Sequence, residues 1–334
     1  MGRILVTGGA GFLGQYLVRE LAQAGHVVSV IDLKPSAFPV LDIVPLCERI
    51  SYDVDVTKPE SLRGHFDGVD TVYHLAGIVS FWKKHAALLE RVNVAGTRTV
   101  LAEAARAGVR RIVHVSSVAA IGYGEGDEPV DEEFVFDWPQ AQHKHYMRTK
   151  HLAEEEVRAA LRQGTDVIVA NPGLMWGPGD MTNSANLIGN LQRRKIPGCP
   201  PGGTNIVDVR DVARGLPLVE AKGRSGERYI LGGENIAFRR VYDVIAHTLG
   251  VAPPSLVFPN FSKPFLTALL GLLESVRSSP PPLTADQMDS SFRCRYFRSD
   301  KARRELGWEP EISFERMITD TVAWLRSHAL LPAQ

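Results

Sequence analysis

The segment Thr7-Gly8-Gly9-Ala10-Gly11-Phe12-Leu13-Gly14 decides the fold, and it directly follows the apolar run Ile4–Val6. Its glycines fit two overlapping spacings, G-x-G-x-x-G and G-x-x-G-x-x-G. Beyond them, apolar residues recur at helical spacing, at positions 12, 13, 16, 17 and 21. A strand, a glycine turn and a helix in this order predict a pyrophosphate-binding turn, because backbone N–H groups can then approach the anion without an intervening Cβ. A tight strand-to-helix turn that binds nothing can need the same glycines.

Apolar, β-branched runs alternate with helical patterns through the first half of the chain. The predicted strands are Ile4–Thr7, Val27–Ile31, Ile50–Tyr52, Thr71–Leu75, Ile112–Ser116 and Val167–Ala170. Strands that alternate with helices favour a parallel sheet covered on both faces. The sequence therefore predicts an α/β fold, a doubly wound parallel sheet of the Rossmann type with a smaller C-terminal substrate lobe.

The alternation ends after residue 171, where glycine and proline cluster in Pro172–Asp180 and again in Pro197–Gly203. We expect a dinucleotide-binding domain made of residues 1–170 plus about 205–235. Residues 171–204 plus about 236–334 are expected to form the substrate-binding lobe. The cleft between the two is the expected ligand site.

Composition excludes several classes of function. The 334 residues are 44% hydrophobic, and 38 Lys and Arg balance 38 Asp and Glu. A net charge of zero argues against a nucleic-acid partner and leaves a small-molecule substrate. The three cysteines, Cys47, Cys199 and Cys294, are too few and too scattered for a disulfide framework or a zinc site. We therefore expect reduced thiols, no metal and a cytoplasmic location.

The most apolar stretch is Pro264–Leu273, with the sequence PFLTALLGLL. It is too short to span a bilayer, so we predict a buried or interfacial helix and no transmembrane segment. The start of the chain has neither an apolar signal region nor a small-residue cleavage site.

Asp32 ends the second predicted strand, about twenty residues after the glycines. A carboxylate at this place can accept hydrogen bonds from an adenosine ribose and would repel a 2′-phosphate. No arginine follows it directly, although Lys34 keeps NADP as the less favoured alternative. The sequence thus favours NAD, and a simple strand-end turn is the alternative role for Asp32.

Tyr146 and Lys150 stand four residues apart, so they share one helix face. A free tyrosine titrates near pH 10, and a close ammonium is expected to stabilise the phenolate and lower this pKa. Ser116 and Ser117 end the fifth predicted strand, at the edge where open α/β sheets bind ligands. Separately, these features also fit a solvated helix face and an ordinary turn; their conjunction with the glycine turn and Asp32 indicates catalysis.

These residues resemble those of extended short-chain dehydrogenases/reductases, in the NAD-dependent epimerase/dehydratase group. The resemblance runs from Gly2 to about Leu330 and includes the further segments Asp55-Val56-Thr57, His74–Gly77, Asn93–Thr97, Pro172–Asp180, Val207–Ala213 and Lys301–Trp308. Gly226–Asn235 places the chain nearest the dihydroflavonol reductases, 3β-hydroxysteroid dehydrogenases and hopanoid-associated sugar epimerase-like proteins. The resemblance allows for a homodimer formed through helices.

The resemblance also implies roles for residues of this chain. Ser117, Tyr146 and Lys150 would be catalytic, with Tyr146 as acid/base. Cofactor-binding residues would be Gly8, Gly11, Phe12, Leu13, Gly14, Asp32, Asp55, Val56, Leu75, Ala76, Gly77, Ser116, Tyr146, Lys150, Pro172, Gly173 and Leu174. Many relatives have Arg where this chain has Asn171, which removes any polar contact that the arginine would make.

Aromatic and aliphatic residues in the candidate pocket favour a bulky apolar alcohol or ketone. The substrate residues expected are Val79, Phe81, Trp82, Ser117, Asn171, Met175 and Trp176. The leading hypothesis is an NAD(H)-dependent oxidoreductase that interconverts a secondary alcohol and a ketone. A nucleotide-sugar epimerase or dehydratase with tightly bound NAD is the alternative, since Arg193, Arg194, Arg293, Arg295 and Arg298 are available for a diphosphate. A non-catalytic NAD-binding sensor and peripheral membrane attachment remain further hypotheses.

Overall fold

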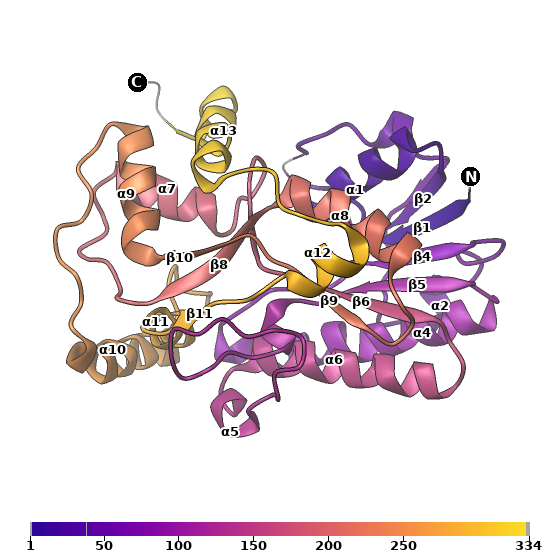
Figure 1. The fold of residues 1–334 in the computed structure, drawn as a ribbon, viewed down its shortest axis with the longest axis horizontal. Helices are drawn as coiled ribbons and strands as arrows, with labels where there is room; N and C mark the ends of the chain where they lie inside the picture. Colours follow the sequence, from indigo (N-terminus) through magenta and orange to yellow (C-terminus); the bar gives the residue numbers. More distant parts are fainter. Residues whose placement is uncertain (1, 38, 332–334) are drawn as a thin grey trace.

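The computed structural model describes residues 2–37 and 39–331, and it is built around a seven-stranded parallel sheet (Figure 1). The strand order is β3-β2-β1-β4-β5-β6-β9. Their bounds are β1 (Arg3–Thr7), β2 (Val27–Ile31), β3 (Arg49–Ser51), β4 (Thr71–His74), β5 (Arg111–Val115), β6 (Val167–Pro172) and β9 (Arg228–Leu231). The predicted doubly wound sheet is confirmed. Its strand order reverses between β1 and β4, which is where such sheets bind ligands.

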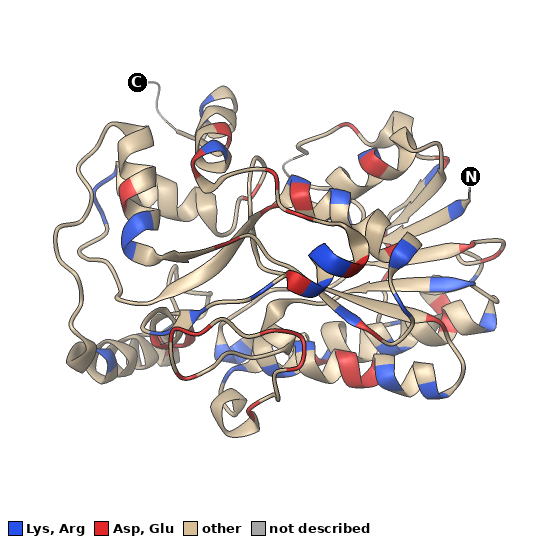
Figure 2. Cartoon of the chain, in the orientation of Figure 1, with Lys and Arg blue, Asp and Glu red and all other residues tan. Residues whose placement is uncertain are grey.

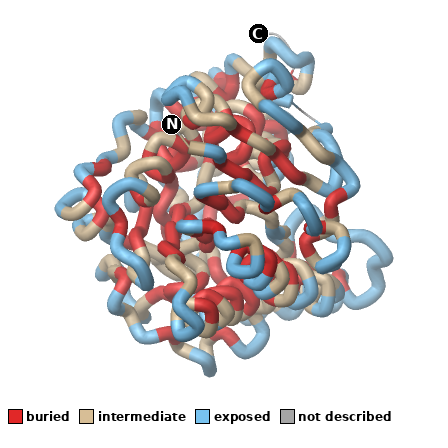
Figure 3. The backbone as a smooth tube through the Cα atoms, turned by 90° about the vertical axis from the view of Figure 1, so that its right-hand side faces the viewer, coloured by how far each residue is buried: buried red, intermediate tan, exposed pale blue. Residues whose placement is uncertain are grey.

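Helices cover both faces of this sheet. One face carries α1 (Phe12–Gln23), α8 (Val209–Lys222) and α12 (Asp300–Leu306), and the other carries α2 (Pro59–Leu62), α4 (Gly96–Arg106) and α6 (His145–Arg162). The strands are buried on both sides, as Figure 3 shows for the middle of the molecule. Parallel strands need such double cover, which explains why their sequences are almost continuously apolar.

A smaller sheet forms beyond the C-terminal ends of the strands. Its strand β8 (Gly203–Asp208) pairs in parallel with β7 (Leu174–Trp176) and β11 (Cys294–Arg295), and antiparallel with β10 (Glu234–Ala237). Helices α7 (Ser184–Gln192), α9 (Phe238–Leu249) and α13 (Phe314–Ser327) enclose a core of their own with Trp176. Although β8 falls within 205–235, it belongs to this smaller sheet, whereas α8 and β9 belong to the larger one.

The remaining helices are short or peripheral. They are α3 (Ala86–Leu89), a π-helical segment at Glu90–Ala95, α5 (Trp138–Ala141), α10 (Lys263–Val276) and α11 (Ala285–Ser291). Short 3₁₀ turns lie at Val44–Leu46, Lys83–His85, Val118–Ala120 and Asn260–Ser262. The helix expected over Pro264–Leu273 is present as α10; of the two alternatives, buried or interfacial, the structure excludes burial, because Phe265 is 83% exposed and Leu272 is 67% exposed. Among the described residues, no helix is long and apolar enough to cross a membrane.

Shortening Leu216 tests the packing of α8 on the sheet. Leu216 is fully buried in the cluster that joins α1, α8 and the strands. Leu216→Ala should lower the free energy of unfolding by roughly 2–5 kcal/mol, since it leaves a cavity in a close-packed core. Val44→Ala, at a side chain that is 66% exposed, should change it by less than about 0.5 kcal/mol. Chemical denaturation measures both, and equal losses would contradict this packing.

Candidate active site

The glycine turn lies after β1, where the strand order reverses. Gly8 has a φ of +73°, and a Cβ on it would lie 2.8 Å from the amide nitrogen of Ala76. A Cβ on Gly14 would clash with the Gly8 carbonyl, and one on Gly9 would lie 2.7 Å from Val30. Helix α1 begins after Gly11 with no side-chain cap and no acidic residue in its first turn. The helix start therefore leaves backbone N–H groups for an anion.

Asp32 holds this turn from the end of β2. Its carboxylate accepts hydrogen bonds from the amides of Ala10, at 3.0 Å, and Leu33, at 2.7 Å. Burial raises the pKa of Asp32, although these two bonds oppose the shift. Negative charge right beside this carboxylate is therefore unfavourable, in contrast to negative charge at the first turn of α1.

A chain of buried hydrogen bonds joins the turns after β1 and β4. The amide of Ala76 donates to the Thr7 hydroxyl, which lies 2.8 Å from Nδ1 of His74, and Nε2 of His74 lies 3.1 Å from the Thr97 hydroxyl. Thr97 in turn donates to the Asn93 carbonyl. Every group is satisfied if His74 carries its proton on Nε2, so we assign this tautomer. Burial lowers the pKa of His74 to about 3, which keeps the ring neutral.

Asn93 fixes the backbone beyond β4. Its side-chain amide forms hydrogen bonds in both directions with the main chain of Ile78, at 2.9 and 3.1 Å. A Cβ on Gly77 would lie 3.2 Å from Oδ1 of Asn93 and 3.7 Å from Nζ of Lys150. Gly77, the last residue of the predicted segment Leu75–Gly77, is thus close to Lys150. Asn93 belongs to one of the segments that carry the family resemblance, but the sequence does not predict it as a site residue. Its position in a π-helical segment is a structural sign of a functional site, since such segments often occur at functional sites.

Tyr146 and Ser117 are brought together by α6 and the end of β5. Burial raises the pKa of Tyr146 to about 12, while a hydrogen bond from Ser117 acts to lower it. The ring of Phe81 packs edge-on against Tyr146, with ring centres 5.5 Å apart. The expected lowering of the tyrosine pKa by Lys150 is not found, because desolvation dominates. The phenol therefore stays protonated near neutral pH.

Lys150 lies one helical turn beyond Tyr146 and is 9% exposed. Its ammonium donates to the Val115 carbonyl at 3.3 Å. Burial lowers the pKa of Lys150 to about 8, and the negative charge of Glu154 opposes the shift. Lys150 consequently changes protonation state within about one pH unit of neutrality.

Glu154, which sequence reasoning missed, lies behind these groups on the same face of α6. This carboxylate is 2% exposed and accepts hydrogen bonds from the Ser116 hydroxyl, at 2.6 Å, and the Asn171 amide, at 2.7 Å. The Asn171 amide also donates to the Ser117 carbonyl at 2.9 Å. Ser116 and the fully buried Asn171 thus support Ser117 from behind. The spacing of Tyr146, Lys150 and Glu154 at i, i+4 and i+8 was the signal available in the sequence.

Other predicted cofactor residues follow β3 and β6, which are not neighbours in the strand order. Asp55 accepts hydrogen bonds from the amide and hydroxyl of Thr57, and these bonds hold the pKa of Asp55 below its usual range although burial acts to raise it. Val56 is buried and packs beside Gly96. Gly173, between Pro172 and Leu174, has no room for a Cβ because Asn205 lies against it.

The predicted substrate residues fall into two groups. Phe81 contacts Tyr146, and Val79, 61% exposed, precedes it on the same segment. Trp82 is buried and stacks edge-on with His85 at 4.9 Å. Trp176 packs against Phe314 in the core of the smaller lobe, and Met175 packs on the α1–α8 cluster. Phe81 therefore lies beside Tyr146, Val79 is exposed two residues before it, and Trp176 is a core residue.

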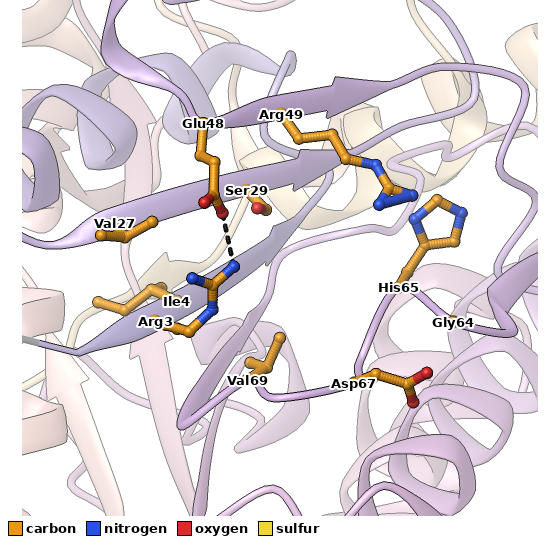
Figure 4. A pocket seen from close by; sticks show the side chains of 10 residues that line it. All are labelled: Arg3, Ile4, Val27, Ser29, Glu48, Arg49, Gly64, His65, Asp67 and Val69. Atoms are coloured by element: carbon orange, nitrogen blue, oxygen red, sulfur yellow. Dashed lines mark hydrogen bonds and ion pairs between the residues drawn. The ribbon is translucent and has the colours of Figure 1, made fainter.

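A pocket of about 360 Å³ lies away from this site (Figure 4). Its walls include Arg3, Val27 and Arg49, at the starts of β1, β2 and β3, and Arg3 pairs with Glu48 across it at 2.7 Å. The glycine turn follows the opposite ends of these strands. Within the described part of the chain, no group of three or more His, Cys, Asp or Glu side chains is arranged to hold a metal ion.

Comparison with known families agrees with this geometry. The profile of the NAD dependent epimerase/dehydratase family matches residues 4–232, which is more than half of the chain. The chain belongs to this family. The match begins in β1 and ends just after β9, so it spans all seven strands of the large sheet.

Individual members of the family resemble the protein along nearly its whole length. Sterol demethylase protein B of Methylococcus capsulatus is 32% identical, with 98% of this chain and 99% of the relative covered. A 4-hydroxy-2-methyl-3-oxo-4-farnesyl-3,4-dihydroquinoline-1-oxide ketoreductase of Stigmatella aurantiaca is 29% identical, with 94% of each covered. The dTDP-glucose 4,6-dehydratase of Streptomyces venezuelae, solved with NAD bound, has a TM-score of 0.77 at 26% identity, with 97% of each chain covered.

Removing the amine of Lys150 from this family member should stabilise it near neutral pH. A buried lysine with a pKa of about 8 instead of 10.5 destabilises the folded state by roughly 3 kcal/mol below pH 8, because one pKa unit is about 1.4 kcal/mol. The unfolded chain binds the extra proton, so this penalty disappears as the pH rises from 8 to 10.5. Lys150→Met should therefore unfold at higher denaturant than the wild type at pH 7, with the difference shrinking by pH 10. A difference that does not change with pH would contradict the buried, destabilised ammonium.

Proposed function

We propose that the protein is an NAD(H)-dependent oxidoreductase that interconverts a secondary alcohol and a ketone on a bulky apolar substrate. The observation that carries the proposal is the convergence of the Tyr146 phenol and the Ser117 hydroxyl beside Gly77 and Lys150. This convergence lies at the carboxyl ends of β4 and β5, next to the glycine turn. Reduction of a ketone needs a proton donor and a hydrogen-bond donor at the carbonyl oxygen. In the reverse oxidation, the same group accepts the proton of the alcohol.

The residues present fit a dinucleotide. Gly8 and Gly14 leave room that a Cβ would fill, and the first turn of α1 offers N–H groups with no competing side chain. Asp32 lies where an adenosine ribose would bind, and we propose that it selects NAD over NADP by repelling a 2′-phosphate. The nicotinamide of NAD supplies or accepts the hydride when it is bound.

The chain's own groups would carry the proton. Ser117 would donate a hydrogen bond to the substrate oxygen, and Tyr146 would give its proton to that oxygen during ketone reduction. The raised pKa of Tyr146 favours this direction, because the phenol stays protonated at neutral pH. Lys150 would hold the cofactor ribose and stabilise the phenolate once it forms. Glu154 and Asn171 position Ser117 without touching the substrate.

The apolar side chains beside Tyr146 favour an apolar substrate. Phe81 covers one side of the phenol, and Val79 extends the same surface toward solvent. We propose that residues 1–170 with α8 and β9 bind the cofactor, and that the smaller lobe closes over the substrate. Two relatives with a sterol and a farnesylated quinoline in their names support a bulky, apolar substrate class.

Tyr146→Phe tests the proposed proton transfer. It should lower kcat about 10²- to 10⁴-fold for reduction of an apolar ketone, because the proton donor is lost while the ring that packs on Phe81 is kept. Tyr242→Phe removes a hydroxyl from the smaller lobe and serves as the matched control, with unchanged kcat expected. Nicotinamide absorbance measures both. Equal rates for Tyr146→Phe and the wild type would contradict the proposed role.

Asp32→Asn tests cofactor selection. The amide oxygen can still accept from Ala10, but the negative charge is gone, so the ratio of NADP to NAD affinity should rise about tenfold, or about 1.4 kcal/mol. Asp53→Asn removes an exposed charge nearby and should leave the ratio unchanged. Calorimetric titration with each dinucleotide measures the two constants, and a ratio that stays the same in Asp32→Asn would refute the assignment.

A nucleotide-sugar epimerase or dehydratase is the second candidate, and buried guanidinium groups favour it. The Nε atoms of Arg293 and Arg295 are buried and have no hydrogen-bond partner within the described residues. Arg193 and Arg194 are exposed, and Arg298 pairs with Asp131. A nucleotide-sugar enzyme would convert its substrate with no net change in cofactor redox state, and Arg295→Met would weaken binding of a nucleoside diphosphate. The proposed oxidoreductase instead consumes one cofactor for each ketone.

A further inference from the structure

Helix α10 presents an apolar face to solvent. Six side chains form this face, which we call the α10 stripe: Phe261, Phe265, Leu269, Leu272, Leu273 and Val276. Each is between 49% and 83% exposed; Phe261 lies in the short turn just before the 14-residue helix, and the other five lie along its exposed side. A contiguous exposed apolar patch of this kind marks a contact surface.

The side of α10 that faces the lobe is mixed, because Leu266, Thr267 and Leu270 are partly buried on it beside Glu274. Glu274 is 3% exposed and accepts a hydrogen bond from the amide of Ala285, at the start of α11. Lys263 pairs with Asp289 of α11 at 2.8 Å. The helix is therefore held to the lobe by polar contacts as well as by these partly buried side chains, and the stripe remains on the solvent side.

The charge around the stripe is positive. Glu274 is the only carboxylate between residues 255 and 283, and it points inward. Lys83, Lys84 and Arg277 are exposed near the C-terminal end of α10, where the Lys84 ammonium donates to the Arg277 carbonyl at 2.6 Å. Figure 2 shows α10 at the edge of the molecule. Apolar side chains bordered by cations suit an anionic bilayer surface.

Two contacts tie the α10 stripe to the proposed active site. Lys84 follows Phe81 on the segment that packs against Tyr146, and Lys84 binds the end of α10. Lys144, which precedes α6 and Tyr146, pairs with Asp286 and Asp289 of α11 at 3.0 and 2.8 Å. The segments on either side of Tyr146 therefore contact the end of α10, through Lys84, and its neighbour α11, through Lys144.

We propose that the α10 stripe docks into the surface of an anionic lipid bilayer and places the active site beside the membrane. Delivery of an apolar substrate from the bilayer rests on the proposed function, whereas the docking itself does not. A second copy of this chain fits the stripe less well, because in a two-fold contact the cations at the C-terminal end of each α10 would face a stripe that presents no exposed carboxylate to pair with them.

Co-sedimentation with vesicles tests the docking on the full chain. Vesicles of phosphatidylcholine with phosphatidylglycerol should bind the wild type, and vesicles of phosphatidylcholine alone should bind it at least tenfold less tightly. Leu272→Glu should weaken binding to the anionic vesicles at least tenfold, because it places a carboxylate in the stripe. Val44→Glu, at a position of equal exposure on another element, should bind like the wild type. Added salt should weaken the wild-type interaction.

The outcomes separate this proposal from the proposed enzymatic activity. Tyr146→Phe should bind vesicles as the wild type does, and Leu272→Glu should still reduce a short, water-soluble ketone at the wild-type rate. Absence of vesicle binding by the wild type, or equal binding by Leu272→Glu, would overturn the docking proposal whatever the enzyme activity. Sedimentation velocity without lipid adds one more outcome: a wild-type dimer that Leu272→Glu dissociates, together with no vesicle binding, would assign the stripe to self-association instead.

Discussion

The close approach of two backbone turns, one after β1 and one after β4, governs the rest of the site. A Cβ on Gly8 would lie 2.8 Å from the Ala76 amide, which is itself bound to the Thr7 hydroxyl. Because the two turns touch, Gly77 passes within van der Waals distance of where Lys150 reaches from α6. Any side chain at position 8 would push the two turns apart. The glycine turn would then no longer be held at a fixed position relative to Gly77 and α6.

Helix α6 carries residues of the proposed active site and a buried carboxylate behind them. It carries Tyr146 and Lys150 toward the site and Glu154 behind it, and Glu154 fixes Ser117 through Asn171. Burial shifts the pKa of Tyr146 upward and that of Lys150 downward, so both side chains are driven toward their neutral forms. Desolvation thus costs stability at Lys150, whose amine lies beside the Val115 carbonyl and Gly77. Protonation at such a site is governed by burial more than by the attraction between the two side chains.

The large sheet could be predicted from the sequence because its parallel strands are apolar on both faces and alternate with helices. The smaller sheet could not, because β11 has two residues and pairs with Gly203 and Thr204, about ninety positions away. Residue types and spacing indicated the candidate site, but they gave no information on which side of a strand each residue lies. Asn171 was therefore expected near substrate. It is instead fully buried behind Ser117, where its side-chain amide donates a hydrogen bond to the Ser117 carbonyl.

Helix α10 shows the same limit of sequence patterns, with consequences for stability. Its periodicity predicts an amphipathic helix, but periodicity alone does not say that the apolar side faces inward. Here Lys263, Glu274 and Lys84 attach the helix by ion pairs and hydrogen bonds, so its attachment to the lobe does not depend on burying the stripe. A helix attached in this way can expose its apolar side chains to a lipid bilayer without any change in the fold. The stripe can therefore release hydrophobic free energy only by binding something outside the chain. The segment with Phe81 and Lys84 contacts both α10 and Tyr146, so such binding would occur close to the proposed active site.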